Sequence, residues 1–382
     1  MTLLWSGAFV LVFSLWLFHG HSFNTFPPAK AELATYGGAA RPYSARVLVP
    51  WTVRLLLAPI PRSTRHDLVE RWADAHPSID GALGFFDSHR DFALELALTI
   101  LLDAAALAGF LLVLRKLLRS LYASSAWVER SAPVVAVLLL PLFFARSSHF
   151  LYDFPALFLF TAALLLVHQR RTGWLALVLF FGTLNKESMA LALVVCALDE
   201  FGGTPRPRRA IRLGGLTLVV VAARLLAMTF SHPAATAAGQ NNWMRNYFTT
   251  NLAAFLRDPF LFDPVRLAAL LLFVLLILAG YQRKPPFLCR ILPVTVPFLA
   301  LYVWGSLWGE IRALYELVPI LFLMGYQTVC EAIGLELAPR AEGAPAAPPA
   351  PSGIALWPMV SATALGLFLL AAGVTLAVLA LP

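Results

Sequence analysis

The sequence predicts an all-α, polytopic transmembrane helical bundle, and three features support this prediction. Hydrophobic residues make up 59% of the 382 residues, and charged residues make up only 13%, against roughly 25% in soluble domains. Long apolar stretches follow one another with short basic segments between them. Their lengths are those of membrane helices. A soluble fold is excluded, and the net charge of +8 does not indicate nucleic acid, because the basic residues lie beside the apolar stretches.

We expect about nine spans and one hairpin of two short helices. The first span, Leu3–Phe18, lacks a basic segment before it and a cleavage-site pattern after it, so we expect it to be retained. The later spans are expected at Phe92–Leu114, Ala132–Ala145, Phe154–His168, Leu213–Phe230, Val265–Tyr281, Phe287–Trp308, Ala313–Val329 and Ile354–Leu381.

A large polar loop, residues 19–91, follows the first span. Apolar residues recur at helical spacing over Arg46–Ile60 and Thr64–His76, which is typical of short helices lying on a membrane surface. Arginine clusters such as Arg206–Arg212 mark the opposite side as cytoplasmic. The N-terminus is therefore expected in the cytoplasm and the loop outside.

The stretch Trp174–Leu198 has the length of one span, yet basic residues flank it on both sides. A hairpin resolves this conflict, with its turn at Leu184–Glu187. We further divide the chain into a transmembrane domain (1–337), a linker rich in proline and alanine (338–353) and a C-terminal transmembrane helix (354–382).

Candidate site residues gather in four loops that the expected topology places at the external leaflet. Carboxylates beside cations at a membrane surface suit displacement of a phosphate from a lipid-linked donor, because a carboxylate accepts the proton of the attacking hydroxyl and cations stabilise the leaving phosphate. The candidates are Glu32, Tyr43, Arg46, His149, Tyr152, Asp153, Lys186, Glu187, Glu310 and Arg312.

Structural roles compete with these functional ones. Asp153 precedes Phe154-Pro155 and can start a helix. Lys186 and Glu187 can satisfy each other at a buried turn, and Arg46 can reach lipid phosphates. We expect an internal partner for Asp103, placed near the middle of a span. His149 has no second ligand at helical spacing, so no metal site is predicted.

Two segments resemble the GT-C class of integral membrane glycosyltransferases, HFLYDFPALFLFTAALLL and WLALVLFFGTLNKESMALAL. ARPYSARVLVPWTVRLL and GEIRALYELVPILFLM are similar to further segments of that superfamily. The resemblance implies transfer of a sugar from a polyprenyl-phosphate donor to an external acceptor in a bacterial inner membrane. Such enzymes usually carry an Asp soon after the first span, and here Glu32 is the only acid before Arg46.

In this interpretation Glu32 and Asp153 are the catalytic residues, and the remaining candidates bind substrate. The expected partners are the polyprenyl-phosphate-linked sugar and membrane lipid. We predict no cofactor, although a divalent metal is compatible with the carboxylates. Two alternatives share the same charged residues: a non-catalytic membrane assembly subunit with a protein partner, and a lipid or solute transporter. Many transporters show repeated pairs of interrupted helices, whereas the sequence has one interrupted segment.

Overall fold

The chain is almost entirely helical in the part that the structure describes. The computed structural model describes residues 2–18, 35, 46–141, 150–200, 206–230, 249–250, 253, 271–272, 274–305, 311–335 and 337–340. Its longer helices are α1 (Thr2–Phe18), α3 (Leu48–Leu57), α4 (Arg62–Ala75), α5 (Ser78–Phe85), α6 (Ala93–Leu121), α7 (Ala126–Leu139), α9 (Asp153–His168), α10 (Thr172–Asn185), α11 (Leu191–Glu200), α12 (Arg206–Phe230), α15 (Pro286–Ile291), α16 (Thr295–Gly305) and α17 (Val318–Ala332).

Short 3-10 helices and one pair of strands complete the described secondary structure. The 3-10 helices are η3 (Arg90–Phe92), η4 (Glu187–Ala190), η6 (Tyr281–Arg283), η7 (Leu292–Val294) and η8 (Ile311–Leu317). Strand β1 (Tyr122–Ser124) pairs antiparallel with β2 (Leu337–Pro339). The all-α prediction is therefore confirmed at this level.

Three helices in the described ranges are long and apolar enough to cross a membrane, fewer than the nine predicted spans. They are Arg90–Leu121, Pro207–Thr229 and Pro286–Trp304. The predicted span Phe154–His168 corresponds to α9, whose 16 residues fall short of the roughly 20 that a bilayer core requires. The predicted span Ile354–Leu381 lies outside the described residues.

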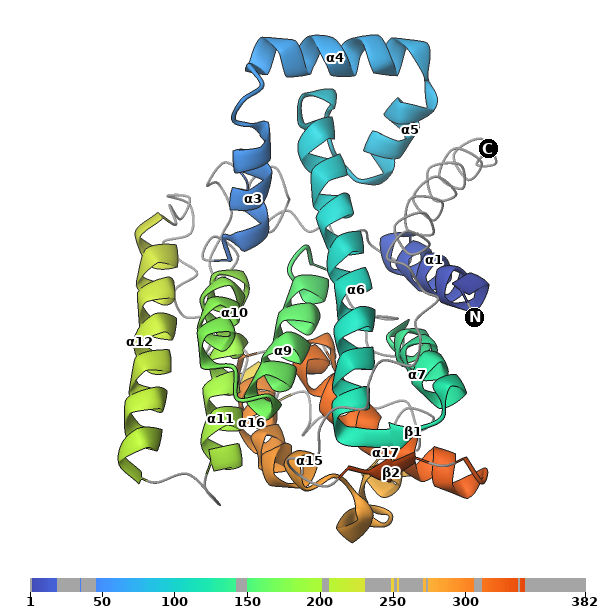
Figure 1. Ribbon diagram of the computed structural model, residues 1–382. Coiled ribbons are helices and arrows are strands. Elements are labelled where there is room, and N and C mark those ends of the chain that lie inside the picture. The colour runs from blue at the N-terminus through green and yellow to red at the C-terminus, as the bar shows by residue number, and fades with distance from the viewer. Residues whose placement is uncertain are drawn as a thin grey trace.

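Short helices are present where they were predicted in the first loop, as α3 and α4. In Figure 1, α4 lies across one end of α6, and α3 descends beside α6 towards α10. An ion-pair cluster fastens this end, because the Arg90 guanidinium donates to Asp80 (Nε–Oδ1, 2.7 Å) and to Glu70 (Nη1–Oε2, 2.6 Å). We call the α3–α5 end of the molecule the loop end.

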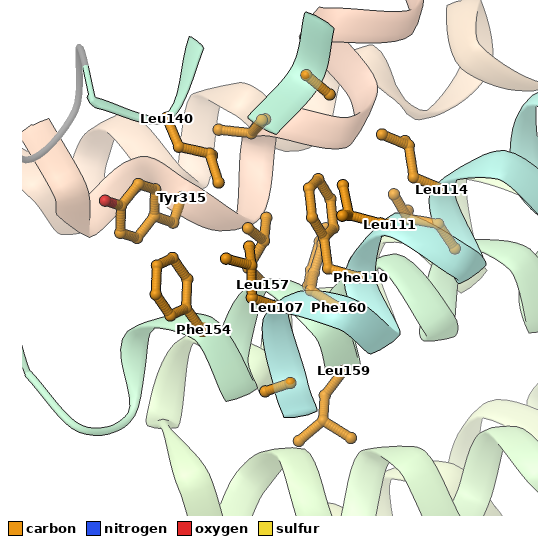
Figure 2. Close-up of a cluster of buried hydrophobic side chains, with 14 of the residues drawn as sticks. Leu107, Phe110, Leu111, Leu114, Leu140, Phe154, Leu157, Leu159, Phe160 and Tyr315 are labelled. Atoms are coloured by element: carbon orange, nitrogen blue, oxygen red, sulfur yellow. The ribbon is translucent and has the colours of Figure 1, made fainter. Parts of the chain in front are cut away.

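The centre of the fold is the contact between α6 and α9. Leu107, Phe110 and Leu111 of α6 face Phe154, Leu157 and Phe160 of α9 (Figure 2). Gly109 permits close approach, because a Cβ there would stand 2.9 Å from the Phe158 ring. Lipid tails are as apolar as these side chains, so close packing rather than exclusion of water holds helices together in a membrane.

The opposite end carries the basic segments. Arg115 of α6 donates from Nε to the Glu129 carboxylate of α7 at 2.7 Å, and Arg119 lies 3.4 Å from the same carboxylate. Beside them, Arg340 Nε donates to the carbonyl of Tyr122 at 2.9 Å. Ala338 and Pro339, the first residues of the expected linker, lie in β2, and residues 341–382 lie outside the described ranges.

The helical break predicted within Trp174–Leu198 is present. Helix α10 ends at Asn185, Lys186 is extended (φ −158°, ψ 139°), and η4 and α11 follow. Both α10 and α11 pack against α9 and α12. A Cβ at Gly182 would collide with the Met189 side chain, so a glycine is needed where η4 folds against the end of α10.

Candidate functional site

Four consecutive residues at the break, Asn185–Ser188, contact several other parts of the chain. We call this segment the NKES turn. The Asn185 amide donates from Nδ2 to the carbonyl of Tyr152 at 2.9 Å. Lys186, Glu187 and Ser188 bind side chains from other elements, described below. The turn therefore joins segments that are distant in sequence.

Glu187 holds two arginines from different elements. Its Oε2 accepts from Nε of Arg46 at 3.2 Å, and its Oε1 lies 3.3 Å from Nη1 of Arg224. Arg46 lies two residues before the start of α3, and Arg224 lies on α12. A backbone bond from Val47 N to the carbonyl of Leu184, 2.8 Å long, fixes the start of α3 against the end of α10. The three charged groups thus meet at a defined junction.

The guanidinium of Arg46 also covers an aromatic ring. Its Cζ lies 4.1 Å from the centroid of the Tyr152 ring, within the range of a cation–π interaction. The Tyr152 ring in turn stacks on Phe150, with centroids 5.3 Å apart. Arg46 is therefore oriented by both Glu187 and Tyr152, and its planar group has a fixed direction.

Lys186 and Glu316 form a buried ion pair between the NKES turn and η8. The Lys186 Nζ lies 2.9 Å from Oε1 and 3.2 Å from Oε2 of Glu316. Both side chains are buried, and the Ser188 hydroxyl also donates to Glu316. Lys186 therefore pairs with Glu316 instead of the neighbouring Glu187, and Glu187 is left to the two arginines.

Asp153 stands at the start of α9 and is buried. Its Oδ2 accepts from Phe150 N at 3.1 Å, and its own N donates to the carbonyl of Phe150 at 3.0 Å. The N-cap of α9 is Tyr152, and Asp153 is the first residue of the helix, so Asp153 is not the N-cap residue that the sequence suggested.

The structure corrects our expectation for Asp103. Neither of its carboxylate oxygens has a hydrogen-bond partner among the residues that the structure describes, although the side chain is 0% exposed. Asp103 is ten residues from the start of α6 at the loop end, which is about 15 Å along the helix. It therefore lies in the middle part of the apolar helix Arg90–Leu121, as the sequence predicts.

The charges around Glu187 determine its ionisation. Burial alone would raise its pKa, but the positive charges of Arg46 and Arg224 outweigh burial and hold the pKa below its ordinary value. Glu187 is thus ionised at neutral pH. The two arginines and this carboxylate together leave one positive charge in excess, which favours a further anion at the junction.

The structure brings together five of the predicted site residues, namely Arg46, Tyr152, Asp153, Lys186 and Glu187. Glu32, Tyr43, His149 and Glu310 lie outside the described residues. Arg312 lies in η8, the element that also carries Glu316. Sequence reasoning placed Arg224 in the external half of a span, and it counted Glu316 among the residues of the external connections without assigning it to the binding residues. The signal for Glu316 was its place one helical turn after Arg312.

No group of three or more potential ligands that could hold a metal ion occurs in the described part of the chain. Comparisons with protein-family models, with curated proteins and with solved structures gave no match to this chain.

Proposed function

We propose that the protein is an integral membrane glycosyltransferase of the GT-C type, which moves a sugar from a polyprenyl-phosphate donor to an acceptor on the external face of a bacterial inner membrane. In this proposal the N-terminus is cytoplasmic, about nine spans cross the membrane, and α10 and α11 form a hairpin entered from the cytoplasm. The observation that supports the proposal is that Arg46 and Arg224 both form ion pairs with Glu187, next to the buried Asp153.

The arginine pair suits a lipid-linked phosphate. Arginine offers a planar fork of donors that matches phosphate oxygens, and Arg46 is already oriented by Tyr152 and Glu187. The excess positive charge of the junction favours the donor phosphate, and Lys186 and Arg312 are additional cations of the proposed site. The polyprenyl chain remains among lipid tails, which explains why a membrane-embedded site suits this donor.

The reaction needs a base and a stabilised leaving group. The acceptor hydroxyl gives its proton to a carboxylate, its oxygen bonds to the anomeric carbon, and the bond from that carbon to the phosphate oxygen breaks. Polyprenyl phosphate leaves as an anion, whose growing charge the arginines stabilise. Asp153 is the proposed base among the described residues, and Glu32 is the proposed base in the first loop.

A binding experiment tests the phosphate site. Purified protein in nanodiscs should bind a polyprenyl phosphate but not the corresponding uncharged polyprenol, as measured by native mass spectrometry. Arg46→Ala and Arg224→Ala should each weaken this binding by about tenfold or more, since a hydrogen bond to a charged group contributes roughly 1.5–3 kcal/mol. Arg71→Ala on the exposed surface of α4 is the matched control and should bind as the wild type does.

A transfer experiment tests the reaction. Membranes containing the protein should release polyprenyl phosphate from labelled polyprenyl-phosphate sugars and transfer the label to an acceptor, and Arg46→Ala should abolish release. Equal transfer by the wild type and by Arg46→Ala would contradict the proposal. Donor binding without any release would favour the non-catalytic subunit instead.

A further inference from the structure

Three polar residues form a buried stripe along α6. Glu95, Thr99 and Asp103 follow at four-residue spacing, so they lie on one face of the helix. All three side chains are buried, and Thr99 donates from its hydroxyl to the carbonyl of Glu95 at 2.8 Å. Ionisable residues within an apolar helix of this length are costly and usually mark a path or a site. The stripe spans about 12 Å along the helix.

The outer end of the stripe opens into a cavity at the loop end. This cavity has a volume of about 700 Å³ and lies between α4 and the start of α6, with Arg62, Arg65, His66, Asp91 and Glu95 among its lining residues. His66 Nδ1 lies 3.0 Å from Asp91, and both side chains are largely exposed to water. Glu95 is the buried residue of the lining, with Arg65 Nη1 3.5 Å from its Oε1. The cavity therefore connects solvent with the first carboxylate of the stripe.

The inner end of the stripe reaches the candidate site. Asp103 lies one helical turn before Leu107, which faces Phe154 of α9 (Figure 2), and Asp153 directly precedes Phe154. Both carboxylates are buried. Buried polar atoms nearly always find a partner, whether protein or ordered water, and the oxygens of Asp103 have none among the described residues. Two buried carboxylates repel each other when both are ionised, and a shared proton removes that repulsion.

The surroundings of Asp103 contain few other charges. Of the elements packed on α6, α9 contributes Asp153, and α3 contributes Arg54, which is exposed. Charged residues of α4 and η3 lie near Glu95, eight residues away. Glu129 of α7 pairs with Arg115 and Arg119 at the other end of the helix, where Arg130 also lies. Asp153 is thus the carboxylate that α9 brings to α6.

We propose that Glu95, Thr99 and Asp103 line a proton path from the external cavity to an Asp103–Asp153 pair that holds one proton. The role assigned to this path, which is to carry away the proton of the acceptor hydroxyl, rests on the proposed function. The acceptor hydroxyl gives its proton to the oxygen of Asp153, and the proton that the pair already held leaves from Asp103 through water beside Thr99 and Glu95 to the cavity, so that the pair again holds one proton. Only a proton moves along the stripe, and the electron pair of the O–H bond stays on the attacking oxygen. Asp103 acts through Asp153 and is a positioning residue.

Infrared spectroscopy of the full-length protein in nanodiscs tests the shared proton. The wild type should show the C=O band of a protonated carboxyl at neutral pH, and Asp103→Asn should lose or shift it. Asp103→Glu should keep the band of a protonated carboxyl, shifted to a different frequency. Either variant therefore tests the pair if the other folds poorly. The matched control is Glu129→Gln, because Glu129 is buried but paired with two arginines, and its removal should leave the band unchanged. An identical band in Asp103→Asn and the wild type would overturn the pair.

Deuterium exchange tests the path. After transfer to heavy water the band should shift as the carboxyl exchanges its proton. Thr99→Val and Glu95→Gln should slow this shift by about tenfold, equivalent to roughly 1.4 kcal/mol of added barrier. Thr161→Val is the matched control, because Thr161 of α9 makes the same kind of bond, to the carbonyl of Leu157 at 2.7 Å, outside the stripe. Equal exchange rates in Thr99→Val, Glu95→Gln and the wild type would overturn the path.

These measurements separate the path from the proposed transferase activity, because neither requires a sugar donor. A band that depends on Asp103 and exchanges slowly in Thr99→Val supports the path even if membranes transfer no sugar. Sugar transfer whose rate and pH profile are the same in the wild type, Asp103→Asn and Thr99→Val would contradict the path and leave the transferase proposal standing.

Discussion

Arg46 and Glu187 are separated by 141 residues in the chain, yet Nε of the arginine lies 3.2 Å from Oε2 of the glutamate. The bond joins the start of the surface helix α3 to the NKES turn inside the helical body. Arg224 binds the other oxygen of the same carboxylate. Removal of this single carboxylate would therefore weaken the contacts among α3, α12 and the NKES turn. It would also leave Arg46 and Arg224 without the anion that both bind.

The first prediction concerns the pH dependence of this junction. Because the pKa of Glu187 is lowered in the folded protein, its ion pairs stabilise the fold fully above its ordinary pKa, near 4.5, and are lost as the pH falls further. Wild-type protein in detergent should unfold at a higher temperature than Glu187→Gln at pH 7, with the difference disappearing towards pH 3. Thermal unfolding followed by tryptophan fluorescence at a series of pH values measures this.

The side chain of Glu187 is 34% exposed, so water screens the pairs and the effect is modest. Glu331→Gln is a suitable control, because Glu331 pairs with the exposed Arg283 at the other end of the protein. A difference between the wild type and Glu187→Gln that stays constant from pH 7 to pH 3 would contradict the lowered pKa.

The second prediction concerns the buried pair of Lys186 and Glu316. Lys186→Met leaves the Glu316 carboxylate buried without its cation, which should lower the free energy of unfolding by about 3–5 kcal/mol. The double variant Lys186→Met/Glu316→Gln should be more stable than the single variant, because no buried charge is left unpaired. Denaturation in detergent of the wild type, both single variants and the double variant gives the coupling energy.

The exposed pair of Arg283 and Glu331 provides the comparison. Its Arg283 side chain is 72% exposed, so Arg283→Ala should change stability by only about 0–1 kcal/mol. Strictly additive effects of Lys186→Met and Glu316→Gln would show that these two groups do not depend on each other.

Much of the helical pattern could be predicted from apolar periodicity and from proline and arginine positions. The helices α3 and α4 and the break after Asn185 followed from these local signals. Composition identifies an apolar stretch, but it does not show whether that stretch is long enough to cross a membrane alone. Helix α9 was predicted within one residue of its bounds, and its 16 residues are fewer than the roughly 20 that a bilayer core requires.

The site was predicted by residue type, and its pairings were not. A lysine followed by a glutamate suggests a mutual pair, but the backbone of the NKES turn directs Lys186 to Glu316 and Glu187 to Arg46 and Arg224. Such choices depend on which helices pack side by side, which one sequence does not reveal. Asp103 was assigned an internal partner for the same reason, because the sequence does not show which polar groups the neighbouring helices bring to it.

The third prediction tests the packing that shapes the NKES turn. A Cβ at Gly182 would collide with Cγ of Met189, and Met189 is the buried residue of η4. Gly182→Ala should therefore push η4 away from α10 and lower the free energy of unfolding by about 1–3 kcal/mol, the usual effect of overpacking. It should also weaken polyprenyl phosphate binding, because Glu187 lies in η4 and orients Arg46.

Gly173 offers the matched control, because it lies on the same helix and a Cβ there meets no atom within 4 Å. Gly173→Ala should keep or slightly raise stability, since alanine favours the helix by up to about 1 kcal/mol. The double variant Gly182→Ala/Met189→Ala removes the collision, so it should recover polyprenyl phosphate binding even though it loses the buried Met189 side chain. If Gly182→Ala binds polyprenyl phosphate as tightly as Gly173→Ala does, the position of η4 does not control the arginine junction.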